Sequence, residues 1–211
     1  MADLKIVATG GNQRVAKEVL EIVKAVLGDG CQGQACPTSQ LSHSDEGDLY
    51  ICVDSWVREL TKLIPREKIV GLEFTLAARS FADMAKIPEG SKVVLFGNTM
   101  IWSEKIVSFA RNEGIDRLDF SFVCYSDMPR DQIGTKLASA DYILGLEGPI
   151  NDVLLVEYQD FVPPAARVVK LKRVADMKSV CNLMQWVTRF QHRQLSHNVV
   201  NTITDLRSQL Q

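Results

Sequence analysis

The stretch Lys68–Thr99, KIVGLEFTLAARSFADMAKIPEGSKVVLFGNT, decides the fold that we predict for this chain. It opens and closes on short apolar runs, Ile69–Phe74 and Val93–Phe96, which are bounded by turn residues and are typical of buried strands. Apolar residues at helical spacing lie between them and end at the turn Pro88–Ser91. We expect this crossover to join two α/β halves, with the functional site in the cleft between them.

Length and composition limit the classes of protein that fit. A chain of 211 residues with 46% apolar residues can form one large domain or two small ones. A net charge of −2 argues against direct contact with nucleic acid. No apolar run approaches the roughly 20 residues that span a bilayer, and the N-terminus lacks a signal-peptide pattern. The sequence therefore predicts a cytoplasmic protein that has no membrane partner.

The five cysteines are scattered along the chain. Cys52 and Cys124 fall in strand-like runs and Cys181 falls in a helix, where thiols act as small apolar side chains. Cys31 and Cys36 share a predicted loop without zinc-ligand spacing. We therefore expect a reducing compartment, no metal and no cofactor.

Strands alternate with helices in both halves, which predicts parallel sheets covered by helices. The elements expected in the first half are strands at Leu4–Thr9, near Ala35, at Leu49–Val53 and at Ile69–Phe74, with helices from Gln13 to Gly28 and from Trp56 to Pro65. Those expected in the second half are strands at Ser91–Phe96, Leu118–Tyr125, Asp141–Leu146 and Val168–Leu171, with helices after Thr99 and Asp127. Val153–Val156 fits a short strand or a helix equally.

Two glycine turns that follow strands are candidate ligand contacts. Thr9–Gln13 feeds a helix, where backbone N–H groups and the helix dipole attract an anion. The full G-x-G-x-x-G pattern and a Walker lysine are missing, so a plain tight turn fits equally well. The second half has a matching turn, and the Gly-Asn pairs Gly11-Asn12 and Gly97-Asn98 correspond. Open α/β sheets bind ligands beyond such strand ends.

Two acidic residues near strand ends complete the predicted cleft. Asp54 ends a strand like a receiver phosphoacceptor, but that chemistry needs an acidic pair after the first strand, and Thr-Gly-Gly-Asn stands there. We favour a helix cap for Asp54-Ser55, with cleft contact as a second role. Glu73, inside an apolar strand, must pair with a cation or line a wet cleft. The predicted ligand-binding residues are Gly10, Gly11, Asn12, Asp54, Ser55, Glu73, Phe74, Gly97, Asn98, Thr99, Tyr125 and Glu147.

The tail from Ala175 is predicted to be helical to its end. An apolar stripe from Met177 to Phe190 is expected to pack on the first subdomain. Beyond it, Val199, Ile203, Leu206 and Leu210 follow the four-three-four spacing of a coiled-coil seam. The helix could fold back on its own domain or act as a dimerising connector, and we favour the connector.

Known catalytic motifs are missing from the sequence. There is no G-x-S-x-G, no H-E-x-x-H and no cysteine–histidine signature. Glu73 and Glu147 could form a carboxylate pair, as in enzymes that use two acids. We expect a binding protein that has no catalytic residues.

Four segments resemble a known family: DLYICVDS (Asp48–Ser55), VGLEF (Val70–Phe74), PEGSKVVLFGNT (Pro88–Thr99) and KRVADMKSVCNLMQWVTRF (Lys172–Phe190). They are similar to the N-terminal sensory domains of sigma-54-dependent transcription regulators, the group related to the propionate catabolism activator. The resemblance implies two α/β subdomains around an effector cleft, followed by AAA+ and DNA-binding domains that this sequence lacks. We therefore expect this chain to be either an excised domain of such a regulator or a stand-alone relative of its sensory domain.

The predicted architecture is α/β, with two Rossmann-like, periplasmic-binding-protein-like parallel-sheet subdomains, a cleft and a long C-terminal helix. The subdomains are residues 1–74 and 75–171, and the helix occupies 172–211. The predicted function is sensing of a small polar or anionic metabolite by a homodimer. The alternatives are an enzyme acting on a phosphorylated or carboxylated substrate, with Glu73 or Glu147 as base, and a scaffold with an empty cleft.

Overall fold

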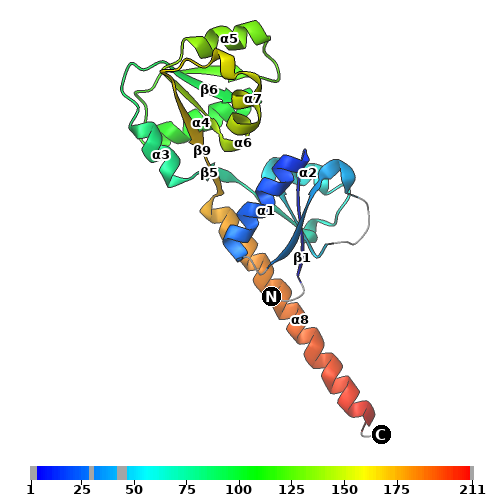
Figure 1. Cartoon of the computed structure of the whole chain (residues 1–211). Helices are drawn as coiled ribbons and strands as arrows, with labels where there is room; N and C mark the ends of the chain where they lie inside the picture. Colours follow the sequence, from blue (N-terminus) through cyan, green and yellow to red (C-terminus); the bar gives the residue numbers. More distant parts are fainter. Residues whose placement is uncertain (1–3, 29–30, 42–46, 210–211) are drawn as a thin grey trace. The chain divides into compact units, whose positions relative to one another are not determined.

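A computed structural model describes residues 4–28, 31–41 and 47–209, with side chains up to residue 196. The chain divides into two compact units (Figure 1). Unit 1 is Met1–Phe74 together with Ala175–Gln211, and unit 2 is Thr75–Val174. The predicted α/β class, with two Rossmann-like parallel sheets and a long C-terminal helix, is confirmed. No described helix is both long and apolar enough to cross a membrane.

Unit 1 is built on a four-stranded parallel sheet in the order β2-β1-β3-β4. Its strands are β1 (Lys5–Gly10), β2 (Gln32–Pro37), β3 (Leu49–Val53) and β4 (Ile69–Leu72). Its helical segments are α1 (Gln13–Leu27), η1 (Thr38–Gln40), η2 (Asp54–Trp56), α2 (Val57–Leu60), η3 (Arg66–Lys68) and α8 (Met177–Gln209).

Helix α1 begins and ends where the sequence predicts. The Asn12 side chain accepts a hydrogen bond from the Val15 N–H at 3.0 Å, which satisfies a donor that the helix itself leaves unpaired. Gly28 follows the last turn with φ +87°, a backbone conformation that favours glycine. Between these ends, Ala16, Val19 and Val23 are buried, so one apolar face holds α1 to the sheet.

Two local predictions for unit 1 need correction. The uncertain strand near Ala35 is β2, which pairs with β1 along its whole length, from Lys5 opposite Gln32 to Gly10 opposite Pro37. The helix expected from Trp56 is four residues of α2 that follow the 3₁₀ turn η2. No side chain caps the start of either segment, so the prediction that Asp54-Ser55 caps a helix is wrong. Asp54 instead lies inside the 3₁₀ turn.

Unit 2 repeats this architecture with the strand order β7-β6-β8-β9. Its strands are β6 (Val93–Gly97), β7 (Phe120–Cys124), β8 (Tyr142–Leu146) and β9 (Arg167–Leu171). Its helical segments are α3 (Ala78–Ala85), α4 (Met100–Asn112), α5 (Arg130–Ala138), α6 (Glu147–Pro149), η4 (Ile150–Leu154), α7 (Leu155–Glu157) and η5 (Gln159–Phe161). Val153–Val156, which fitted a strand or a helix, is therefore helical, and η4 is a π-turn.

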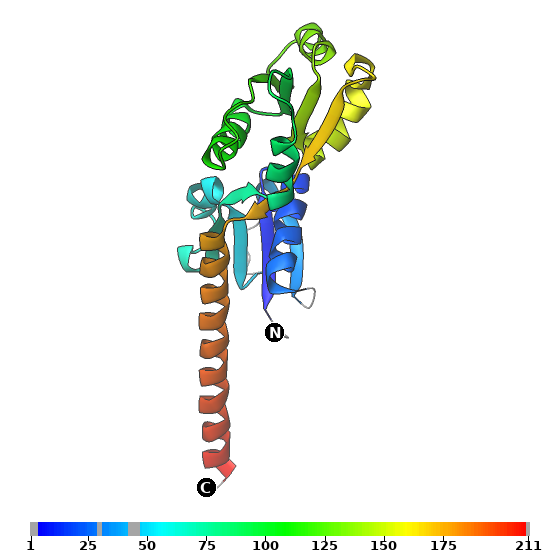
Figure 2. The same cartoon turned by 90° about the vertical axis from the view of Figure 1, so that its left-hand side faces the viewer.

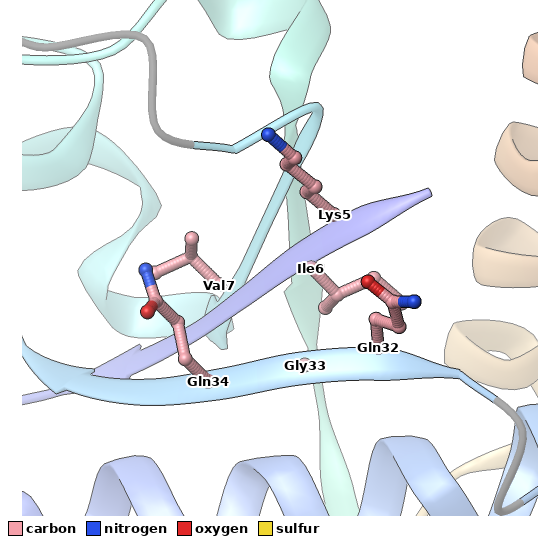
Figure 3. A pocket seen from close by; sticks show the side chains of 6 residues that line it. All are labelled: Lys5, Ile6, Val7, Gln32, Gly33 and Gln34. Carbon is pink, nitrogen blue, oxygen red and sulfur yellow. The ribbon is translucent and has the colours of Figure 1, made fainter. Parts of the chain in front are cut away.

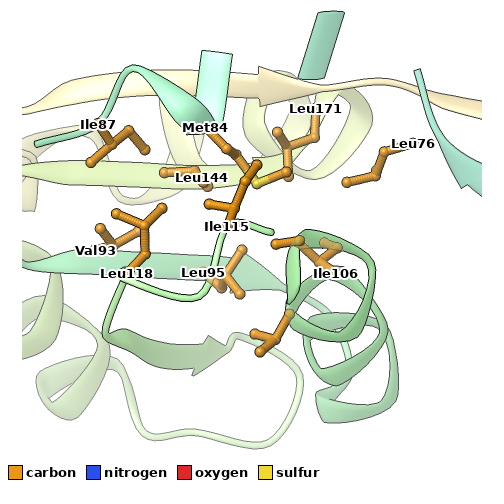
Figure 4. Close-up of a cluster of buried hydrophobic side chains, with 12 residues drawn as sticks. Leu76, Met84, Ile87, Val93, Leu95, Ile106, Ile115, Leu118, Leu144 and Leu171 are labelled. Atoms are coloured by element: carbon orange, nitrogen blue, oxygen red, sulfur yellow. The ribbon is translucent and has the colours of Figure 1, made fainter. Parts of the chain in front are cut away.

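The core of unit 2 lies on both faces of its sheet. On one face, Val93 and Leu95 of β6 meet Met84 of α3 and Ile106 of α4 (Figure 4). The other face packs against α5 and the η4 turn through a separate buried cluster. Because the strands are apolar on both sides, they appear in the sequence as continuous apolar runs.

The strand pairing within each sheet, compared between the two sheets, shows which residues of the two units are equivalent. Thr9 lies opposite Cys52 in unit 1, and Leu95 lies opposite Leu144 in unit 2. β4 pairs with β3 and β9 pairs with β8, and β4 and β9 are equivalent because residues 68–84 and 167–183 are repeats; these registers together align Gly10-Gly11-Asn12 with Gly97-Asn98-Thr99. The predicted correspondence of the two Gly-Asn pairs is therefore shifted by one residue. The aligned Asn12 and Thr99 both occupy the N-cap position of the following helix.

The chain crosses between the units twice, at two strands that pair with each other. These strands are β5 (Phe74–Leu76) and β10 (Arg173–Ala175). The segments around them are repeats: residues 68–84, KIVGLEFTLAARSFADM, align without a gap with residues 167–183, RVVKLKRVADMKSVCNL. Each crossing strand follows the last strand of one sheet and leads into a helix, α3 or α8.

Reciprocal hydrogen bonds confirm this repeat. In unit 1 the Glu73 N–H donates to the Ser179 hydroxyl at 2.8 Å, and the Asp176 N–H donates to the Glu73 carbonyl at 3.0 Å. The equivalent bonds of unit 2 run from the Lys172 N–H to the Ser80 hydroxyl at 3.0 Å and from the Ala77 N–H to the Lys172 carbonyl at 2.9 Å. Each helix is thus tied to the end of the sheet on which it packs.

Helix α8 packs on β4 of unit 1 and then continues past the sheet (Figure 2). Ser179, Leu183 and Val187 are buried against the unit. The Trp186 indole N–H donates to the Glu67 carbonyl at 2.7 Å, and its ring stacks on Phe190 at 5.4 Å. The predicted coiled-coil seam lies outside the described side chains; its residues are Val199, Ile203, Leu206 and Leu210.

Candidate functional site

The strand order of unit 1 creates a switch point between β1 and β3. From β1 the chain passes through α1 to β2 on one side, while β3 lies on the other side. Loops at the carboxyl ends of strands diverge at such a point, and ligands of open α/β sheets bind there. The register, continued two residues past Thr9 and Cys52, places Gly11 level with Asp54. Two predicted site residues therefore flank this point.

Trp56, which no sequence pattern indicated as a site residue, forms part of the same surface. A Cβ atom on Gly11 would lie 2.9 Å from the Trp56 ring, so the indole covers this glycine closely. The Trp56 side chain stays 37% exposed and can still contact a ligand. Asp54 lies beside it, and its carboxylate would be 2.5 Å from a Cβ atom on Gly71 of β4. Glycine at these two positions makes room for the side chains that follow β3.

The Gly10–Asn12 turn is held by the end of β2. The Thr38 hydroxyl donates to the Gly10 carbonyl at 3.0 Å and lies 3.0 Å from the Thr9 hydroxyl. The Gln13 side-chain amide donates to the Ala35 carbonyl at 3.2 Å. The Asn12 oxygen caps α1, as described above. These bonds fix the conformation of the turn. Thr38 could not be selected from the sequence, because it follows a strand with little apolar signal.

Glu73 and Phe74 lie in different surroundings from those expected. Glu73 falls between β4 and β5 with an exposed side chain, so its predicted place inside one continuous strand, Ile69–Phe74, is wrong. Its backbone carries the two bonds to α8. The Phe74 side chain is buried, at 8% exposed, and serves the packing of unit 1. Ser55 is exposed beside Asp54.

Unit 2 has the equivalent switch point between β6 and β8. Gly97, Asn98 and Thr99 are half-buried after β6. The continued register places Asn98 level with Glu147, which is exposed at the start of α6. Tyr125 follows β7, where its N–H donates to the Gly97 carbonyl at 3.0 Å. Its ring stacks on Phe96 with centroids 5.1 Å apart.

The two sites share one plan, which the sequence did not show. Each has a glycine whose carbonyl accepts a hydrogen bond from the residue that follows the neighbouring strand, Thr38 or Tyr125. Each has an exposed carboxylate on the other side, Asp54 or Glu147. A carboxylate accepts hydrogen bonds from hydroxyl or ammonium groups, whereas the first turn of a helix donates to anions. Either site can therefore bind a small polar molecule.

Metal binding and reactive-thiol chemistry each require particular groups among the described residues. No group of three or more His, Cys, Asp or Glu residues within the described ranges could hold a metal ion. Burial, together with the charge of Asp54, raises the pKa of the Cys52 thiol to about 12. Burial and the charge of Asp127 also raise the pKa of Cys124. Both thiols stay protonated at neutral pH and are poor nucleophiles.

A separate hollow of about 620 Å³ lies along the β1–β2 pair (Figure 3). Its described lining residues share no member with the predicted site and come from the amino-terminal halves of the two strands. They are Lys5, Ile6, Val7, Gln32, Gly33 and Gln34. Because ligands of open parallel sheets bind beyond the carboxyl ends, we assign the candidate sites to the strand ends and not to this hollow.

No protein-family model matches this chain, and no curated protein matches it.

Proposed function

We propose that this chain is the effector-sensing regulatory part of a bacterial sigma-54-dependent transcription regulator, acting in the cytoplasm as a homodimer. The observation that carries the proposal is the shared plan of the two strand-end sites, each with a glycine turn opposite an exposed carboxylate. The resemblance of the four sequence segments supplies the regulator class. The AAA+ and DNA-binding domains would lie on other parts of the regulator, and the DNA-binding domain would contact DNA, because a net charge of −2 does not favour contact by this segment.

The proposed effector is a small polar or anionic metabolite that binds at the strand-end site of a unit. The turns Gly10–Asn12 and Gly97–Thr99 precede α1 and α4, whose first turns favour anionic groups. Asp54 and Glu147 favour hydrogen-bond donors and repel a purely anionic ligand. A molecule with a carboxylate and a hydroxyl or ammonium group, such as a hydroxy acid or an amino acid, matches both requirements.

The proposed output is helix α8. Its first turn is bonded to Glu73, directly after β4, and its third turn is bonded to Glu67 through Trp186. A change at the end of the unit 1 sheet is therefore passed to α8 through short hydrogen bonds. An effector can shift this equilibrium only by binding one conformation of the chain more tightly than another.

A thermal-shift screen tests the proposal. We expect one member of a panel of hydroxy acids, amino acids, dicarboxylates and nucleotides to stabilise the protein by ~2.7 kcal/mol at 100 times its Kd. Asp54→Asn and Glu147→Gln should each weaken that stabilisation. The control Glu113→Gln, at the exposed end of α4, should leave it unchanged.

Two outcomes would contradict the sensor. The first is a panel without any stabilising compound, or a stabilising compound that is insensitive to both site variants. The second is turnover of a phosphorylated or carboxylated compound that is lost in Glu73→Gln or Glu147→Gln, which would establish the enzyme alternative.

A further inference from the structure

One face of α8 exposes more apolar surface than its packing on unit 1 requires. Met177, Met184 and Leu195 are 75%, 45% and 63% exposed. Together with Cys181, Thr188 and Gln191, they follow each other at alternating spacings of four and three residues. Gln191 is the position of this series that carries a polar amide. At 3.6 residues per turn, these positions fall on one stripe of the helix, away from the buried stripe that faces the sheet.

Helix α3 offers a comparison within the same molecule. It is the repeat of the first two turns of α8 and makes the same bonds to its own sheet. The residues of α3 equivalent to Met177, Cys181 and Met184 are all alanine, and all three are exposed; they are Ala78, Ala82 and Ala85. The large apolar side chains of α8 are therefore not needed to attach such a helix to a sheet.

The stripe is also free of charge along its described length. The charged residues between 177 and 196 are Lys178, Arg189 and Arg193. At 100° per residue they lie on another side of the helix, beside the exposed Asn182. Two copies of the stripe could therefore meet without bringing like charges into contact.

The length of α8 favours another helix as the occupant. Residues 191–196 are all exposed, and the helix continues to Gln209. A projecting helix of this length is marginal in water unless a partner covers its apolar side. Four-three spacing is the pattern by which one α-helix packs along another.

We propose that the stripe Met177, Cys181, Met184, Thr188 and Leu195 pairs with the same stripe of a second copy in a parallel, in-register coiled coil. This deepens the proposed function, since it rests on the homodimer and names its contact face. Parallel pairing places Thr188 opposite Thr188 and Gln191 opposite Gln191, so both polar layers are matched. It also brings both C-terminal ends together, which suits a helix that connects to further domains.

Oxidative cross-linking of the full chain tests the face and the orientation. Of the five cysteines, Cys181 is exposed, whereas the others are buried or half-buried. Parallel pairing brings the two Cys181 side chains within disulfide reach. Diamide should produce a covalent dimer that is lost in Cys181→Ser and kept in Cys36→Ser. A dimer in solution that forms no Cys181 disulfide would overturn the parallel pairing.

Sedimentation of two matched variants tests the interface itself. Met184→Glu places two carboxylates in the pairing stripe and should sediment as a monomer. Asn182→Glu adds the same charge on the other side of α8 and should remain a dimer. A monomeric wild type at every concentration, or equal behaviour of the two variants, would overturn the proposal. Effector stabilisation should persist in Met184→Glu, so failure of the coiled coil and failure of the sensor can be told apart.

Discussion

The substitution Ser179→Ala tests how α8 is attached to unit 1. Ser179 is only 4% exposed, and its hydroxyl accepts the Glu73 N–H at 2.8 Å. Alanine keeps the bond from the residue 179 N–H to the Asp176 carboxylate, so the helix start remains capped. The variant therefore removes one acceptor and leaves one backbone donor unpaired.

The expected cost follows from that unpaired donor. Loss of a partner for a buried N–H costs ~1–3 kcal/mol, and the value for Glu73 should be near the middle of this range because its own side chain is exposed. A cost of ~2 kcal/mol corresponds to about 30-fold faster exchange of the Glu73 amide hydrogen, if exchange proceeds through local release of the start of α8.

Hydrogen exchange followed by mass spectrometry measures this directly. Ser80→Ala is the matched control, because Ser80 accepts the Lys172 N–H in the equivalent position of unit 2. Ser179→Ala should accelerate exchange around Glu73 and not around Lys172, and Ser80→Ala should do the reverse. Unchanged exchange at Glu73, or equal acceleration at both amides in either variant, would refute this attachment of α8 through Ser179.

Three further predictions concern packing, protonation and the helix anchor. Gly145→Ala should lower the free energy of unfolding by ~2–3 kcal/mol in a urea titration, because its Cβ atom would lie 2.5 Å from a carbonyl oxygen of β6; Gly97→Ala, whose nearest contact would be 3.5 Å away, should cost clearly less. The raised pKa of Cys52, about 12, makes the thiol contribute stability that is complete below pH 9 and is lost as the pH rises towards 12, and Cys52→Ala should remove this part of the pH dependence. Trp186→Phe should keep an aromatic ring but lose the 2.7 Å hydrogen bond to Glu67, lowering stability by ~1 kcal/mol in thermal unfolding.

Local signals were sufficient for most elements of the fold. The runs that form β3, β6 and β8 are apolar on both faces, so they can be recognised without knowing their neighbours. Helix α1 carries its own cap and stop residues. Strand β2, QGQACP, lies at the sheet edge without any large apolar side chain, and its pairing with β1 is what makes it a strand. Edge strands of this kind lack the apolar pattern on which prediction relies.

The candidate site was only partly predictable for a similar reason. The glycine turns and the carboxylates Asp54 and Glu147 follow recognisable strands, so their place at strand ends could be inferred. Thr38 and Trp56 lie at the same surface because the fold brings them to Gly10 and Gly11, which are distant from them in the sequence. Asp54 was assigned to a helix cap because its sequence context allows one, but the chain forms a 3₁₀ turn there.

By itself, the sequence determined the alternation of strands and helices, the α/β class and the long final helix, because each depends on periodicity within a few turns of chain. The tertiary structure decided the order of the strands, the one-residue shift between the two glycine turns and the reciprocal serine bonds. These depend on hydrogen bonds in which at least one partner is a backbone group, between segments as far as 106 residues apart, such as the bond from the Glu73 N–H to the Ser179 hydroxyl. Every residue offers the same backbone donor and acceptor, so side-chain identity alone does not reveal which segments will meet.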